Sequence, residues 1–164
     1  MRFFRYTVLP LVMTTSFAFS QQVQQPEQKP SCAIVRTDHY DCNRDAFLHR
    51  LAQAKSIRIH TARMDSYGEG QMQKLVAELG KQVAANGQPF DLIFELVKID
   101  HAGRIEVGPY DISFAYLKVF DPVLGSGDAG LVWAETLDGP SERPWPAAVL
   151  DVVKQFRAHI AGAN

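Results

Sequence analysis

Residues 56–99 read SIRIHTARMDSYGEGQMQKLVAELGKQVAANGQPFDLIFELVKI, and this stretch decides the fold. Residues 56–64 alternate apolar with polar side chains, which predicts a strand with one wet face. Ser66, with a glutamate three positions later, fits a helix-capping box. A helix should follow and end at Asn86-Gly87, because apolar residues recur at helical spacing: Met72, Leu75, Val76, Leu79 and Val83. Residues 90–99 then predict a second strand, joined to the first by a right-handed crossover.

Two more strands are expected downstream, at residues 112–120 and 131–137. Residues 122–130 join them and contain three glycines, which favours a hairpin loop. The first three strands to follow the predicted helix, at 90–99, 112–120 and 131–137, should therefore form an antiparallel meander.

A helix is expected at each end of this core. Asn43 can cap a short helix over residues 44–54, and Pro144-Trp145-Pro146 opens a C-terminal helix. The apolar side of the latter consists of Val149, Val153, Phe156 and Ile160. The fold class is thus α+β with the order β-α-β-β-β-α. We expect a mixed four-stranded sheet, two main helices on one face and a short N-terminal helix.

The first twenty residues have the pattern of a signal peptide. Arg2 and Arg5 precede an apolar run over residues 8–19, which is too short to span a bilayer comfortably. Ala18-Phe19-Ser20 places small residues at a cleavage site after Ser20. Residues 21–31, rich in Gln and Pro, predict a disordered tether, and residues 32–164 a single α+β domain.

The charge of the expected mature chain argues against two classes of partner. Loss of Arg2 and Arg5 leaves 15 Lys and Arg against 18 Asp and Glu. A faintly acidic chain lacks the basic surface that binds nucleic acid or anionic lipid. No segment after residue 20 approaches the roughly 20 apolar residues of a membrane helix. We expect no nucleic acid partner and no membrane span in the mature chain.

Cys32 and Cys42 are the two cysteines of the chain. In an exported protein such a pair is most often a disulfide. The alternative is a metal site formed with Asp38, His39 and Asp41, but the spacing of the two thiols matches no common zinc motif. We expect the disulfide and no metal or other cofactor.

No motif identifies a reaction. Residues 124–128, LGSGD, resemble a nucleophile loop but join two antiparallel strands, so a hairpin turn is expected. Residues 68–70 contain two glycines without a phosphate-loop lysine and indicate a helix start, and His60 is expected on the surface beside Arg58. Asp100-His101 falls at a strand end. The catalytic alternative is a small secreted hydrolase that uses Asp100 or Asp111 with His101.

Both faces of the predicted sheet are apolar. One set should pack against the helices: Ile93, Val97, Ala115, Leu117, Val132 and Ala134. The other set is aromatic and is our candidate binding surface: Phe94, Phe114, Tyr116, Phe120 and Trp133. An aromatic face needs a cover. Residues 32–54, a second subunit or partner protein, or an apolar ligand would each provide one.

Several short segments resemble small periplasmic or lipoprotein α/β domains of the bacterial envelope. They are Ala54-Lys55-Ser56-Ile57, Asn86-Gly87, Phe90-Asp91-Leu92-Ile93, residues 116–121 and Leu131-Val132-Trp133. The chain is more loosely similar to the N-terminal domain of the Tol-system propeller protein and to the curli-secretion lipoprotein. The similarity covers residues 54–160, and the chain departs from the lipoprotein members in having no lipobox.

This resemblance implies a noncatalytic accessory module. With the signal peptide, it predicts a periplasmic or secreted domain that acts through protein–protein contact or envelope assembly. Its partner would be another envelope protein or a second copy of the chain.

We predict that the exported protein begins at Gln21. Intact-mass measurement of the protein recovered outside the cytoplasm should give the mass of residues 21–164. A recovered mass that still includes residues 1–20 would contradict the assignment of a cleaved signal peptide.

Overall fold

The computed structural model describes residues 32–36, 39–61, 65–99, 112–136 and 143–162. The predicted signal peptide and tether lie outside these residues. In chain order the elements are β1 (Cys32–Arg36), β2 (His39–Cys42), α1 (Arg44–Gln53), β3 (Ser56–Thr61), α2 (Ser66–Glu78), β4 (Gln82–Val83), β5 (Leu92–Ile99), β6 (Ile112–Phe120), the 3₁₀ turn η1 (Gly127–Gly130), β7 (Leu131–Thr136), β8 (Arg143–Pro144) and α3 (Trp145–Ala161).

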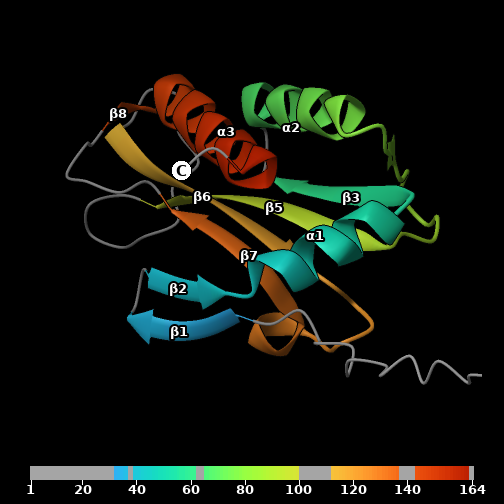
Figure 1. The fold of residues 1–164 in the computed structure, drawn as a ribbon. Coiled ribbons are helices and arrows are strands. Elements are labelled where there is room, and N and C mark those ends of the chain that lie inside the picture. The colour runs from blue at the N-terminus through green and yellow to red at the C-terminus, as the bar shows by residue number, and fades with distance from the viewer. Residues whose placement is uncertain (1–31, 37–38, 62–64, 100–111, 137–142, 163–164) are drawn as a thin grey trace, which may run out of the picture.

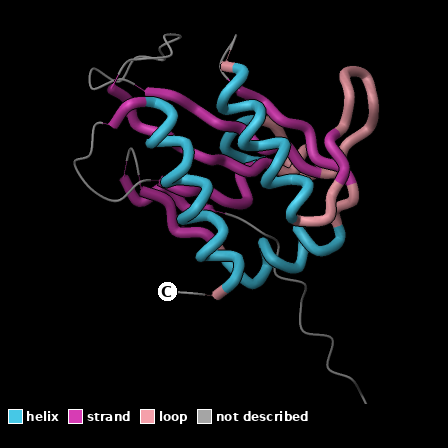
Figure 2. The backbone as a smooth tube through the Cα atoms, turned by 90° about the horizontal axis from the view of Figure 1, so that it is seen from above, coloured by secondary structure: helices cyan, strands magenta, loops and turns pink. Residues whose placement is uncertain are grey.

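The main sheet has the strand order β4-β3-β5-β6-β7 and is mixed. β3 runs parallel to β4 and β5, whereas β5, β6 and β7 form an antiparallel meander. β8 pairs with the first residues of β6. Helices α2 and α3 lie side by side over one face of the sheet (Figures 1 and 2). The α+β class, the meander and the two main helices are as predicted, and β4 and β8 are additional short strands.

Helix α2 is shorter than the sequence pattern predicts. It ends at Glu78, because Gly80 adopts a left-handed conformation with φ of 69°. The chain then pairs with β3 instead of continuing the helix, and Gln82 N–H donates to Lys55 O at 2.9 Å. Val83 therefore lies in β4, 44% exposed, although it continues the helical spacing. The N-cap is Asp65 rather than Ser66.

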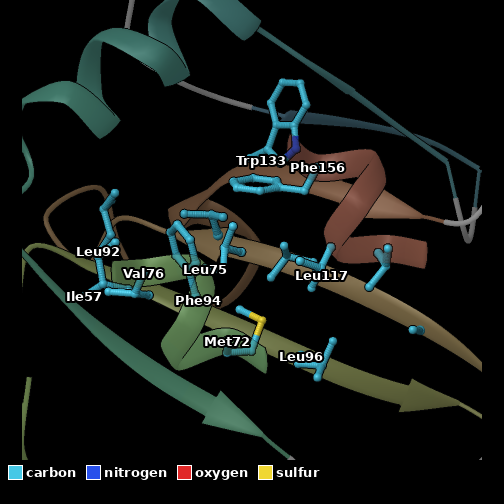
Figure 3. Close-up of a cluster of buried hydrophobic side chains, with 14 of the residues drawn as sticks. Ile57, Met72, Leu75, Val76, Leu92, Phe94, Leu96, Leu117, Trp133 and Phe156 are labelled. Carbon is cyan, nitrogen blue, oxygen red and sulfur yellow. The ribbon is translucent and has the colours of Figure 1, made fainter. Parts of the chain in front are cut away.

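The core lies between the sheet and the helices, and Figure 3 shows part of it. α2 contributes Met72, Leu75 and Val76, and the predicted apolar side of α3 is buried at Val149, Val153 and Phe156. From α1, which Asn43 caps as predicted, Phe47 stacks on Trp133 with ring centroids 5.0 Å apart. None of the helices that the structure describes is long and apolar enough to cross a membrane.

A disulfide closes the hairpin of β1 and β2. Cys32 lies directly opposite Cys42 in the antiparallel ladder, and their sulfurs are bonded, as predicted. The hairpin contacts β7, at the edge of the main sheet (Figure 1). Tyr40 of β2 approaches Lys118 of β6, whose Nζ lies 5.2 Å from the ring centroid. The N-terminal segment thus covers one end of the sheet.

The pairing register shows that the predicted aromatic set does not share one face. Phe94 of β5 is opposite Val119, whereas Phe120 is opposite Ile93. Side chains directly opposite each other project to the same side of a sheet. Phe94 therefore lies on the side of Val119, and Phe120 lies on the other side.

Trp133 is also on the helix side, because it is opposite Val119 in the β6–β7 ladder. Phe94 is fully buried and meets the edge of Phe156 at 5.7 Å. Trp133 is 8% exposed, and its indole N–H donates to the buried carboxylate of Glu135. Phe94 and Trp133 therefore belong to the core and do not share the predicted aromatic surface with Phe120. The prediction that Ile93 and Val97 pack against the helices was also wrong, because both lie on the side of Phe120.

Asp65 joins the N-termini of the two main helices. Its Oδ1 accepts from Gly68 N–H at 2.8 Å, and its Oδ2 accepts from the Trp145 indole at 2.9 Å. The close approach leaves no room at Gly68, where a Cβ would lie 2.1 Å from Asp65 Oδ2 and 2.7 Å from a Leu96 methyl. At Gly70, one position further on, nothing lies within 4 Å of such a Cβ.

We predict opposite effects for the two alanine substitutions. Gly68→Ala should lower the free energy of unfolding by about 2 kcal/mol, because the methyl group overpacks the Asp65 junction. Gly70→Ala should raise it by up to about 1 kcal/mol through helix propensity alone. Urea unfolding of both variants measures the difference. Equal effects would show that no close contact exists at Gly68.

Candidate functional site

A pocket of about 540 Å³ opens on the side of the sheet opposite α2 and α3, which we call the pocket face. It is lined by three strands and by the loop between β6 and β7: His60, Ile93, Glu95, Phe120, Pro122, Gly125, Ser126 and Gly127. Its volume is in the range of ligand-binding pockets. Further residues of the pocket face follow from the strand registers, among them Arg58, Val97, Tyr116 and Lys118.

The polar side of the pocket comes from adjacent parallel strands. His60 of β3 lies beside Glu95 of β5, and Glu95 lies opposite Lys118 of β6. His60 is exposed and Glu95 is half-buried. Among the described residues, neither side chain forms a hydrogen bond or an ion pair. An imidazole and a carboxylate therefore face the pocket with their hydrogen-bonding capacity unused.

The apolar side of the pocket is formed where β5 meets the end of β6. Ile93 and Phe120 are directly opposite each other and both are half-buried. Pro122 continues this surface into the loop. The loop then turns at Gly125 and Gly127, whose φ values of 143° and 59° favour glycine. The pocket thus combines an apolar wall with one carboxylate, as ligand sites commonly do.

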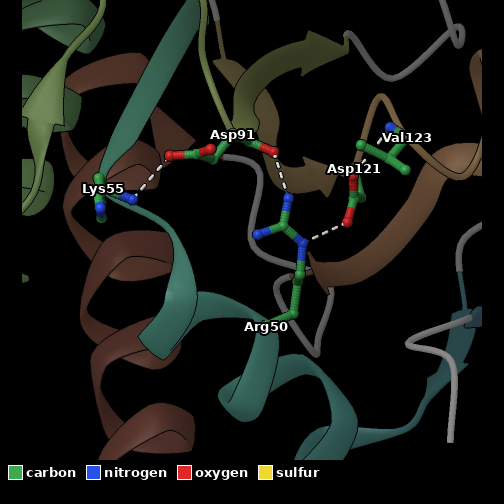
Figure 4. A network of polar contacts seen from close by, with 5 residues as sticks. All are labelled: Arg50, Lys55, Asp91, Asp121 and Val123. Atoms are coloured by element: carbon green, nitrogen blue, oxygen red, sulfur yellow. Dashed lines mark hydrogen bonds and ion pairs between the residues drawn. The ribbon is translucent and has the colours of Figure 1, made fainter. Parts of the chain in front are cut away.

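A polar network beneath the loop holds this wall in place (Figure 4). Arg50 of α1 forms an ion pair with the buried Asp121 and donates to Asp91 O at 2.9 Å. Asp121 also accepts from Val123 N–H at 2.9 Å, and its own N–H donates to Gly130 O at 2.7 Å. Both ends of the loop are therefore bonded to Asp121, and α1 ties that residue to the start of β5.

Asp91 performs a similar role at the entry to β3. One carboxylate oxygen accepts from Lys55 N–H at 2.8 Å, from Ser56 N–H at 3.0 Å and from Ser56 Oγ–H at 3.1 Å. These hydrogen bonds, that from Lys55 foremost, stabilise the charged form and lower the pKa of Asp91 below its ordinary value. Asp91 thereby aligns β3 and β5, the two strands that present His60 and Glu95.

Some of the predicted site residues lie at the pocket, and others lie outside the described residues. Phe120 lines the pocket, and Tyr116 is half-buried on the same face. Phe114 has its backbone in β6, opposite Ile99, but its side chain lies outside the described residues. Asp100, His101 and Asp111, the alternative hydrolase set, also lie outside the described residues. That alternative stays a prediction.

Sequence reasoning missed the pocket itself. His60 was expected to be a surface histidine, which is correct, but its position beside Glu95 was not foreseen. The signal for Glu95 is a carboxylate in the middle of a largely apolar strand, whereas His60 follows the polar alternation of β3. Ser126 was expected in a hairpin turn, and the structure confirms the turn. Nothing local indicated that this turn would face Phe120.

The pocket brings together the three groups of a serine hydrolase, namely Ser126, His60 and Glu95. Such catalysis requires the nucleophile, the base and the orienting acid to be hydrogen-bonded in series. No hydrogen bond joins any two of these side chains in the described part of the chain. Residues 32–162, wherever described, also contain no cluster of three His, Cys, Asp or Glu able to hold a metal.

Comparisons with known proteins found no match: no family model, no curated protein and no solved structure matches the chain. The resemblance to envelope domains therefore stays a prediction.

We predict that Asp91→Asn destabilises the fold in a pH-dependent way. Because the folded pKa is lowered, the carboxylate stabilises the fold fully above the unfolded value, near 3.8, and this contribution is lost as the pH falls through the lower folded value. At pH 7 the substitution should cost about 1–2 kcal/mol. The cost should shrink toward pH 3.

Denaturant unfolding of wild type and Asp91→Asn between pH 7 and pH 3 provides this measurement. Asp128→Asn is the matched control, because Asp128 is exposed and its carboxylate accepts none of these hydrogen bonds. A loss of stability that is the same at every pH would contradict the role of the charged form.

Proposed function

We propose that this protein is an exported, noncatalytic binding module that acts through the pocket face. It would work in the periplasm or outside the cell, in contact with another envelope protein or with a second copy of itself. The surface involved is the side of the sheet opposite α2 and α3.

Two features support export. The first is the signal-peptide pattern of residues 1–20. The second is the disulfide between Cys32 and Cys42, because disulfides persist in oxidising compartments and are rare in the cytosol. The disulfide also closes the hairpin that carries Tyr40, and this hairpin borders the pocket face near β7.

One observation carries the binding role, and it is the difference between the two faces of the sheet. The helix side is filled by a continuous core. On the pocket face, by contrast, three apolar side chains are half-buried and have no helix of the described chain over them: Ile93, Val97 and Phe120. Glu95 and Lys118 lie between these apolar positions, so the face offers both apolar and charged contacts.

We predict that a partner contacts the pocket face and not the outer side of α3. The photo-crosslinking amino acid benzoylphenylalanine should replace Tyr116, where one aromatic group substitutes for another. The control position is Leu150 of α3, which is 47% exposed. Irradiation of cells that export the chain should give a covalent adduct at Tyr116 and none at Leu150.

The mass of the adduct identifies the kind of partner. Twice the mass of the chain indicates a second copy, and any other mass indicates a different protein. Adducts only at Leu150, or equal adducts at both positions, would contradict a binding role for the pocket face. Melting temperatures close to wild type for both variants establish that each is folded.

A further inference from the structure

The pocket contains a carboxylate whose neighbouring cations are engaged elsewhere. Glu95 is half-buried, on a strand with neighbours on both sides, and forms no ion pair within the described residues. A partly desolvated carboxylate attracts a cation more strongly than one in bulk water. The question is therefore which cation would occupy the site.

Among the described residues, Arg58 and Lys118 are the Lys and Arg side chains of the pocket face, and neither forms an ion pair with Glu95. Lys118 lies directly opposite it, but its ammonium group lies 5.2 Å from the ring centroid of Tyr40, on the disulfide-closed hairpin. Arg58, on the other side, lies over the ring of Phe90 at 3.9 Å and donates to Gln88 O at 2.9 Å. Each of these cations thus contacts an aromatic ring, and Arg58 also donates to a carbonyl, although its buried Nε has no hydrogen-bond partner among the described residues.

From this arrangement we infer that the pocket binds a basic side chain of the partner protein, with arginine preferred. This inference rests on the proposed function, because it identifies what the partner presents to the same face. The guanidinium group would meet the carboxylate of Glu95, and the methylene groups of the side chain would lie along the apolar wall formed by Ile93, Phe120 and Pro122.

The preference for arginine follows from the shape and chemistry of the pocket. A planar guanidinium donates two parallel hydrogen bonds to one carboxylate and stacks on an aromatic ring such as Phe120. Ser126 supplies a further acceptor from the loop. A lysine ammonium would match the charge but not the planar contact.

The test is an NMR-monitored titration of the exported form of the chain, with its disulfide intact. The probe is the capped peptide acetyl-Leu-Arg-Leu-amide. Its neutral counterpart carries citrulline, which keeps the shape of arginine without the charge. We expect the arginine peptide to bind about tenfold more tightly than the citrulline peptide, the size of effect typical of a charged hydrogen-bonded pair.

Glu95→Gln should remove this discrimination, so that both peptides bind with the affinity of the citrulline peptide. Glu69→Gln is the matched control, because Glu69 is an exposed glutamate on α2 and should leave the tenfold difference unchanged. Equal binding of the two peptides to the wild-type chain overturns the inference, as does the absence of binding by either.

Benzylamine separates a free amine from a side chain of a protein. If benzylamine binds in a Glu95-dependent way and the arginine peptide does not, the occupant is a small amine and the assignment to a partner protein is overturned. Cross-linking at Tyr116 in the Glu95→Gln background distinguishes a failure of the arginine site from a failure of the proposed function. An adduct that persists there, with no peptide discrimination in the wild type, retains the proposed function and rejects the arginine site.

Discussion

The register between β5 and β6 determines what each side of the sheet can do. Ile93 lies opposite Phe120 on the pocket face, and Leu96 lies opposite Leu117 on the helix side. A slip of β6 by one residue would turn Lys118 toward the helices and Leu117 toward the pocket. The core under α2 and α3 and the pocket on the other side thus depend on the same pairing.

The elements of the fold were predictable because their signals are local. Asn43 begins α1, the apolar spacing of Val149, Val153 and Phe156 marks α3, and alternation marks β3. Register is a different matter, because it depends on which residues of two strands meet. A two-residue hairpin turn would fix it, but β5 and β6 are separated by residues 100–111. The predicted aromatic set therefore placed Phe94 with Phe120, and the pairing separates them.

The end of α2 and the pocket also depend on pairing between distant residues, which local sequence patterns do not indicate. Val83 has helical spacing, but Gly80 and the free backbone groups of β3 divert the chain into β4. His60 and Glu95 lie far apart in sequence, and the parallel pairing of β3 with β5 brings them together. The strand–helix–strand unit made that adjacency of strands predictable. Which residues of the two strands lie side by side depends on the register, and the apolar–polar periodicity of each strand does not determine the register.

α1 and α3, which are far apart in sequence, are in contact. Arg44 donates to His159 O at 2.9 Å, and the ring of Phe47 meets the edge of Phe156 with centroids 6.1 Å apart. The core around Trp133 is therefore incomplete until the last helix has been synthesised. Contacts between residues so distant in sequence form late in folding. A chain that ends before α3 would therefore leave Phe47 without the ring of Phe156, so the N-terminal helix depends on the C-terminal one for part of its packing.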